Sequence, residues 1–89
     1  MDPLERLAEA LAVEAPTATE TGAILSVARD VAHTMERRIT PVSTFLLGVS
    51  VQRRIAAGAS REDALSAAIS DLRAAVPDQG ADDPSGPSG

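Results

Sequence analysis

Four helix-start signals recur along this chain, and they constrain its fold more than any other feature of the sequence. Each pairs a short polar side chain, which can accept a hydrogen bond from the first turn of a helix, with a proline or an acid close behind it. In chain order the signals are Asp2-Pro3 with Glu5, Thr17 with Glu20, Thr40-Pro41, and Ser60 with Asp63. The segments between them place apolar residues at helical spacing, and none alternates with the period of two that predicts a strand. The sequence therefore predicts an all-α protein.

We expect helices over residues 2–14, 20–38, 41–57 and 60–76. Pro16 and Pro77 end the first and the last, because the residue before a proline is pushed away from helical backbone angles. Gly58 is the expected stop of the third helix. These helices predict a compact four-helix bundle or an orthogonal helical array, which forms one domain over residues 1–76. Residues 77–89 are rich in Gly, Pro, Ser and Asp, and they are expected to form a disordered tail.

The third helix is apolar almost all round in its first half. Its apolar residues are Val42, Phe45, Leu46, Leu47, Val49 and Val51. A helix of this kind is normally buried by several neighbours. We therefore place the third helix at the centre of the fold, with Phe45 to Gly48 in the core.

Composition excludes several classes of function. The net charge of −5 opposes contact with a phosphate backbone. A single Phe, with no Trp or Tyr, leaves almost nothing on which a nucleotide base can stack. No apolar run approaches the ~20 residues that cross a bilayer, and the acidic start MDPLERLAEA lacks the basic region of a signal peptide. We expect a cytoplasmic protein that binds neither nucleic acid nor membrane.

The densest set of polar groups lies between Ala28 and Gly48. On a helix that runs to Arg38, Arg29, His33 and Arg37 share one face, where they can present a fork of donors to an anion or a partner carboxylate. The same face is more typical of an ordinary solvated helix with ion pairs. A third interpretation takes Asp30, His33 and Glu36, spaced three apart, as metal ligands of a helical bundle. Such a site needs further carboxylates from facing helices, and we predict no metal site.

Catalysis has little support in the sequence. Ser26 and Ser43 lie near the only histidine, but no nucleophile elbow, phosphate-binding loop or dinucleotide fingerprint is present. A histidine without such partners is more often structural than catalytic. We expect no catalytic residue and no cofactor.

The string ARDVAH, followed by ER and then by TP-x-x-TFLLG, resembles a small actinobacterial all-helical domain of unknown function. That domain occurs alone or after the guanylyltransferase domain of molybdenum-cofactor biosynthesis proteins. The resemblance covers most of residues 3–75. Its matching positions are Arg29, Asp30, Val31, Ala32, His33, Glu36, Arg37, Pro41, Thr44, Phe45, Leu46 and Gly48. It implies a cytoplasmic accessory role near molybdoenzyme assembly.

The leading hypothesis is a non-catalytic accessory or interaction module of molybdenum-cofactor biosynthesis or molybdoenzyme maturation. Its partner is then a molybdoenzyme or a cofactor-biosynthesis protein. The candidate residues for binding a partner or an anion are Arg29, Asp30, His33, Glu36, Arg37 and Thr44. The alternatives are a ligand-binding or metal-binding bundle that uses Asp30, His33 and Glu36, and a self-associating protein whose excess apolar surface forms a homodimer.

Overall fold

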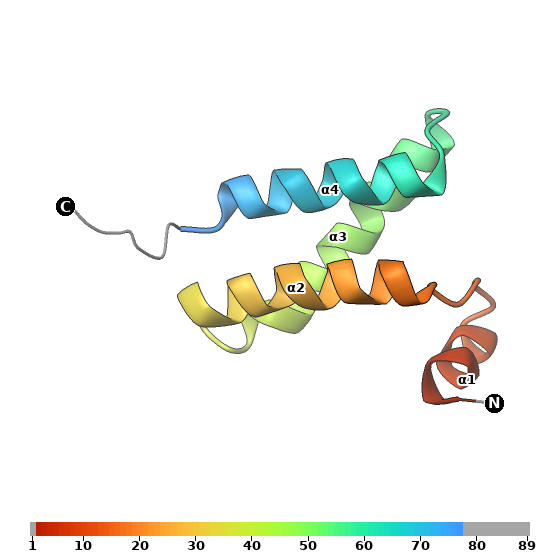
Figure 1. Ribbon diagram of the computed structural model, residues 1–89, viewed down its shortest axis with the longest axis horizontal. Coiled ribbons are helices and arrows are strands. Elements are labelled where there is room, and N and C mark those ends of the chain that lie inside the picture. The colour runs from red at the N-terminus through yellow and green to blue at the C-terminus, as the bar shows by residue number, and fades with distance from the viewer. Residues whose placement is uncertain (1, 78–89) are drawn as a thin grey trace.

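A computed structural model describes residues 2–77 and shows four helices in this range, so the all-α fold is confirmed (Figure 1). The helices are α1 (Pro3–Ala10), α2 (Ala18–Thr34), α3 (Ile39–Ala56) and α4 (Arg61–Ala75). The expected tail, apart from Pro77, lies outside the described residues.

Helix α1 begins as its sequence predicts. The Asp2 carboxylate accepts a hydrogen bond from the backbone of Glu5 at 2.8 Å, and the Glu5 side chain accepts one from the backbone of Asp2 at 3.1 Å. The expected end at residue 14 is wrong, because the helix stops at Ala10. There Ala12 takes a positive φ of 57°, and the backbone of Val13 donates to the carbonyl of Ala8 at 3.0 Å. These bonds satisfy the helix's last carbonyls without a glycine.

Helix α2 begins at the expected capping box, in which Thr17 and Glu20 exchange hydrogen bonds of 2.9 and 3.0 Å. Its expected end at Arg38 is wrong. The helix stops at Thr34, and Met35 adopts an extended backbone. The reason lies in the next helix, which begins at Ile39, before the expected Pro41. A short reversal between two helices needs a few non-helical residues, and here residues 35–38 supply them.

Helix α3 lacks the cap expected from Thr40. Its N-cap residue is Arg38, which makes no side-chain capping bond, and the Thr40 hydroxyl is buried without a partner. The end of α3 agrees with the prediction that Gly58 stops the helix. Gly58 takes a φ of 113°, a conformation that favours glycine, and Ser60 then caps α4 by accepting from the backbone of Asp63 at 3.1 Å.

The core lies where α2, α3 and α4 meet. Its buried cluster consists of Val27, Leu47, Ala68 and Ile69, one or two residues from each helix. Partly buried around this cluster are Ala23, Ile24, Val51, Leu65 and Leu72. The interior contains few large side chains, and a core of this kind leaves a small domain little surplus stability.

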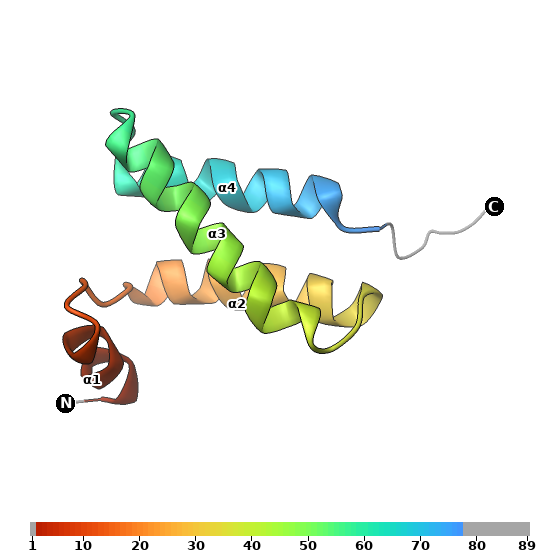
Figure 2. The same cartoon turned by 180° about the vertical axis from the view of Figure 1, so that it is seen from behind.

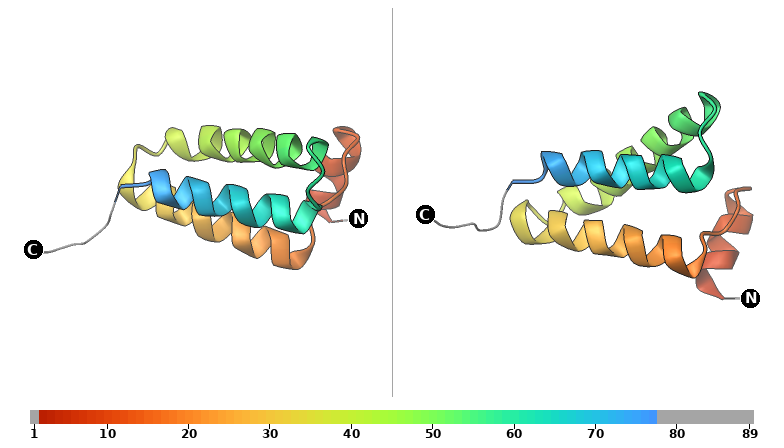
Figure 3. Two further views of the ribbon diagram at one scale, coloured as in Figure 1. Left: turned by 90° about the horizontal axis from the view of Figure 1, so that it is seen from above. Right: turned by 45° about the horizontal axis from the view of Figure 1, so that its top comes forward.

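The three core helices form an oblique array. Helices α2 and α4 run side by side in the same direction, and α3 crosses both of them (Figures 1 and 2). Helix α1 lies beyond one end of this array and makes no close backbone contact with the other three helices (Figure 3). Among residues 2–77 no helix is both long and apolar enough to cross a membrane.

Candidate functional site

The polar residues predicted on α2 lie in two different environments, one exposed to solvent and one facing α4. Arg29 and His33 lie on the exposed side of α2. Their side chains make no hydrogen bond or ion pair with the rest of residues 2–77. Asp30 instead faces α4, where its carboxylate accepts from Nε of Arg73 at 2.9 Å. Arg73 also donates to the hydroxyl of Ser26 at 2.8 Å. Asp30 therefore ties α2 to α4.

The shared helical face predicted for Arg29, His33 and Arg37 does not form. Because α2 ends at Thr34, Glu36 and Arg37 lie in the turn before α3. Glu36 pairs there with Nε of Arg38 at 2.7 Å, and both side chains are exposed. The donor fork thus loses its third member, since Arg37 no longer follows the spacing of a helix.

Thr44, the last candidate, lies on α3, and its hydroxyl donates to the carbonyl of Pro41 at 2.7 Å. This bond within one helix occupies the donor of the hydroxyl. Thr44 lines a cavity together with Glu20, Ile24 and Arg61, and neither Arg29 nor His33 lines it.

The early end of α2 also removes the arrangement that the metal interpretation needs. It required Asp30, His33 and Glu36 on successive turns of one helix, but Glu36 is outside α2 and Asp30 faces Arg73. Within residues 2–77 no group of three or more carboxylate or histidine side chains lies close enough to hold a metal ion.

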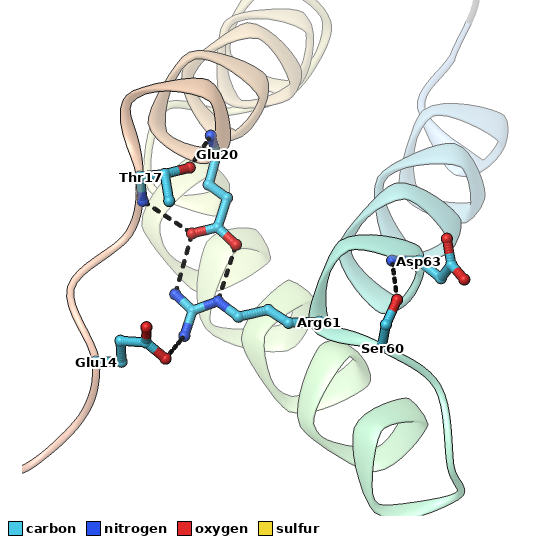
Figure 4. A network of polar contacts seen from close by, with 6 residues as sticks. All are labelled: Glu14, Thr17, Glu20, Ser60, Arg61 and Asp63. Carbon is cyan, nitrogen blue, oxygen red and sulfur yellow. Dashed lines mark hydrogen bonds and ion pairs between the residues drawn. The ribbon is translucent and has the colours of Figure 1, made fainter.

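The strongest polar network lies elsewhere and was missed by the sequence reasoning (Figure 4). Arg61, the first residue of α4, grips the Glu20 carboxylate with two hydrogen bonds, from Nε at 2.8 Å and from Nη2 at 3.1 Å. Its third nitrogen reaches Glu14 at 3.3 Å. The contact fastens the first turn of α4 to the first turn of α2 and to the α1–α2 linker.

This network shifts the ionisation of both partners. Hydrogen bonds from Arg61, and then from the backbone of Thr17, hold the pKa of Glu20 below its ordinary value. The same contact with Glu20 raises the pKa of Arg61. Only the capping box marked Glu20 in the sequence. The partner could not be found there, because Arg61 lies 41 residues away.

An open groove between α2 and α4 contains hydroxyl side chains, so it is the part of the described surface to examine for a catalytic nucleophile. Its lining includes the hydroxyls of Thr19, Ser66 and Ser70 above an apolar floor of Leu65 and Ile69. Activation of a hydroxyl as a nucleophile requires a neighbouring base such as histidine. The only histidine of the chain, His33, does not line this groove, whereas the carboxylates of Glu20 and Glu62 do.

The outer face of α3, which we define as Val42, Phe45, Leu46 and Val49, is the most distinctive surface of the fold. These residues follow the spacing i, i+3, i+4 and i+7, so they form one stripe along the helix. Phe45 is 69% exposed and Leu46 is 60% exposed. The expectation that Phe45 to Gly48 lie in the core is therefore wrong, and of these residues only Leu47 is buried.

Helix α1 carries a second apolar stripe without a partner. Leu4, Leu7 and Leu11 lie on one side of it and are largely exposed. Of the residues of α1 only Ala8 is buried, and its carbonyl accepts the backbone hydrogen bond from Val13 in the turn that ends the helix. Two helices of the chain thus present apolar stripes that their own fold does not cover.

Comparison with known proteins identifies the family. The model of a family described as a domain of unknown function (DUF6457) matches residues 2–84. The chain matches no curated protein and no solved structure.

Proposed function

Since the chain belongs to a family of domains of unknown function, DUF6457, we propose its function from its own surface: it is a non-catalytic interaction module. The observation that carries the proposal is the outer face of α3. Four large apolar side chains are exposed there in one stripe, while the opposite side of the same helix supplies Leu47 to the core. Contiguous exposed apolar surface of this kind typically marks a contact with another protein, and an amphipathic helix is a common ligand for such a face.

The non-catalytic part of the proposal rests on what the predicted polar residues contact. Within residues 2–77, the Arg29 and His33 side chains have no partner, and Asp30 and Glu36 pair with arginines.

We place this module in the cytoplasm of an actinobacterium, as an accessory to molybdenum-cofactor biosynthesis or molybdoenzyme maturation. The resemblance between Arg29 and Gly48 supports this setting. The exposed Arg29 and His33 on α2 offer a polar surface for such a partner, apart from the outer face of α3.

Two measurements on the full chain test these proposals. Sedimentation velocity measures self-association, and calorimetric titration measures binding to a purified guanylyltransferase-like protein of molybdenum-cofactor biosynthesis. We expect Phe45→Glu to weaken at least one of the two interactions by 10-fold or more. The matched control is Leu25→Glu on α2, because Leu25 is 62% exposed and lies outside the outer face of α3.

If Phe45→Glu changes neither interaction, the outer face of α3 is not a binding surface. The molybdenum setting is tested separately by the titration of the wild type and of the Arg29→Ala/His33→Ala double variant. It is contradicted if the wild-type chain does not bind the guanylyltransferase-like protein.

A further inference from the structure

We propose that the outer face of α3 binds helix α1 of a second copy of the chain, so that two copies exchange their first helices. This inference deepens the proposed function, on which it rests, by naming the occupant of the face. Four features support it: the matching spacing of the two uncovered stripes, their charges, their apolar areas, and the linker that holds α1 away from its own α3.

The two stripes match in spacing and length. The stripe from Leu4 to Leu11, the C-cap residue of α1, spans about two helical turns, as the stripe from Val42 to Val49 does on α3. Both stripes are exposed in the single chain. Two helices with stripes of equal length can pack side by side over their whole contact.

Charge favours α1 as the occupant over a second α3. The α1 segment carries Asp2, Glu5 and Glu9 against a single arginine, Arg6. Helix α3 has no carboxylate, and its charged residues are Arg53 and Arg54. A parallel pair of α3 helices would bring the arginines of both copies together, whereas α1 brings carboxylates toward Arg53; Arg54 already pairs with Asp71 of its own chain. Opposite charges across an interface select the partner and its register.

The exposed apolar area of the two stripes also favours α1 as the occupant of the outer face of α3. From the exposed fractions, the outer face of α3 offers on the order of 400 Å² of apolar side chain, and the α1 leucines raise this to roughly 700 Å² for each copy. A stable interface buries about 800 Å² for each partner. Contact between two α3 faces alone supplies about half of that, while exchange of α1 uses both stripes of both copies.

The linker holds α1 away from its own α3. The left-handed Ala12 turns the chain after α1, and Arg61 tethers Glu14 on the far side of that turn. Thr17 is fixed three residues later by the capping box of α2. As a result α1 projects beyond the other helices and makes no close backbone contact with them (Figures 2 and 3). In this position it is free to meet another copy.

A mixing experiment with two single variants of the full chain tests the exchange. Leu7→Arg disables α1 and leaves α3 intact, while Phe45→Glu disables α3 and leaves α1 intact. Both side chains are mostly exposed, so circular dichroism should show unchanged helix content. By sedimentation velocity we expect a wild-type dimer and a dissociation constant at least 100-fold higher for each variant alone.

The decisive sample is the equimolar mixture of the two variants. In an exchanged dimer the mixture regains one intact contact between α1 and α3, and the second contact pairs the introduced arginine with the introduced glutamate. We therefore expect the mixture to dimerise at concentrations where each variant alone is monomeric. The control Leu25→Glu should dimerise like the wild type.

Other outcomes overturn the exchange in distinguishable ways. If Leu7→Arg still dimerises while Phe45→Glu does not, two α3 faces meet each other; the inference fails and the proposed function stands. If the wild type stays monomeric at all concentrations, or if the mixture stays monomeric, the exchange is wrong. The proposed function is then decided by the titration with the guanylyltransferase-like protein alone.

Discussion

Replacing Glu20 by glutamine removes one charge from the contact between the first turns of α2 and α4 while preserving the size of the side chain. Glutamine can still accept the hydrogen bond from the backbone of Thr17, because capping boxes use Glu or Gln at this position. The variant therefore separates the interaction with Arg61 from the capping of α2. Any decrease in the free energy of unfolding therefore measures the contribution of the contact between Glu20 and Arg61.

The expected magnitude follows from exposure and geometry. The Glu20 side chain is only 15% exposed and receives two hydrogen bonds from Arg61, but Arg61 is itself 40% exposed and partly screened by water. Exposed ion pairs contribute about 0–1 kcal/mol, and breaking a buried pair costs about 3–5 kcal/mol. We place Glu20→Gln between these ranges, at about 1.5 kcal/mol. In a domain of this size such a loss lowers the melting temperature by roughly 8 °C.

Urea unfolding followed by circular dichroism measures this loss. The matched control is Glu36→Gln, because Glu36 also pairs with an arginine but is 70% exposed. The control should lose less than about 0.5 kcal/mol. A Glu20→Gln loss no larger than that of the control would refute the conclusion that Arg61 and Glu20 stabilise the fold.

The same contact predicts a dependence on pH. Since the pKa of Glu20 is lowered in the folded chain, its stabilising contribution is fully present above the unfolded value of 4.5 and is lost as the pH falls through the lower folded value. The difference between wild type and Glu20→Gln should therefore shrink as the pH falls below 4.5. A difference that stays constant from pH 7 to about pH 3 would show that the charge of Glu20 is not involved.

Three further substitutions have defined expectations, each measured by the urea midpoint. Gly58→Ala should cost about 1–2 kcal/mol, because φ is 113° and a Cβ meets no atom within 4 Å, so only backbone strain acts; no change would mean that the turn relaxes. Val27→Ala should cost about 2 kcal/mol, since Val27 is fully buried; the exposed Val42→Ala is its control and should cost much less. Thr40→Val should stabilise by about 1 kcal/mol, because it removes a buried hydroxyl without a partner; a loss of stability would show that this hydroxyl makes a bond.

The elements of the fold could be predicted because their signals are local. The capping boxes at Asp2 and Thr17 and the glycine stop at Gly58 act over a few residues, and the structure contains all three. The ends of α1 and α2 could not be predicted from these signals. Ala12 is an alanine in a position where glycine is usual, and α2 ends where the chain must reverse into α3.

The surface of the fold was harder to predict than its elements. Hydrophobicity alone placed Phe45 and Leu46 inside, but three core helices without α1 cannot surround α3. The predicted site failed at Glu36 and Arg37, whose shared face depended on an extra turn of α2. Asp30 could not be assigned either, because its partner Arg73 lies 43 residues along the chain.

Ala12, in the turn that follows α1, has a consequence for the direction in which that helix points. Glycine would remove the strain of the left-handed conformation, but it would also give the backbone a much wider range of angles. Ala12 confines the turn to one narrow basin, at a cost of about 1 kcal/mol. The narrow range of backbone angles at Ala12 limits the directions in which α1 can point, and fewer directions raise its effective concentration at a binding face that lies along one of them. At Ala12 the chain therefore loses a little folding stability, and the orientation of α1 is more restricted in return.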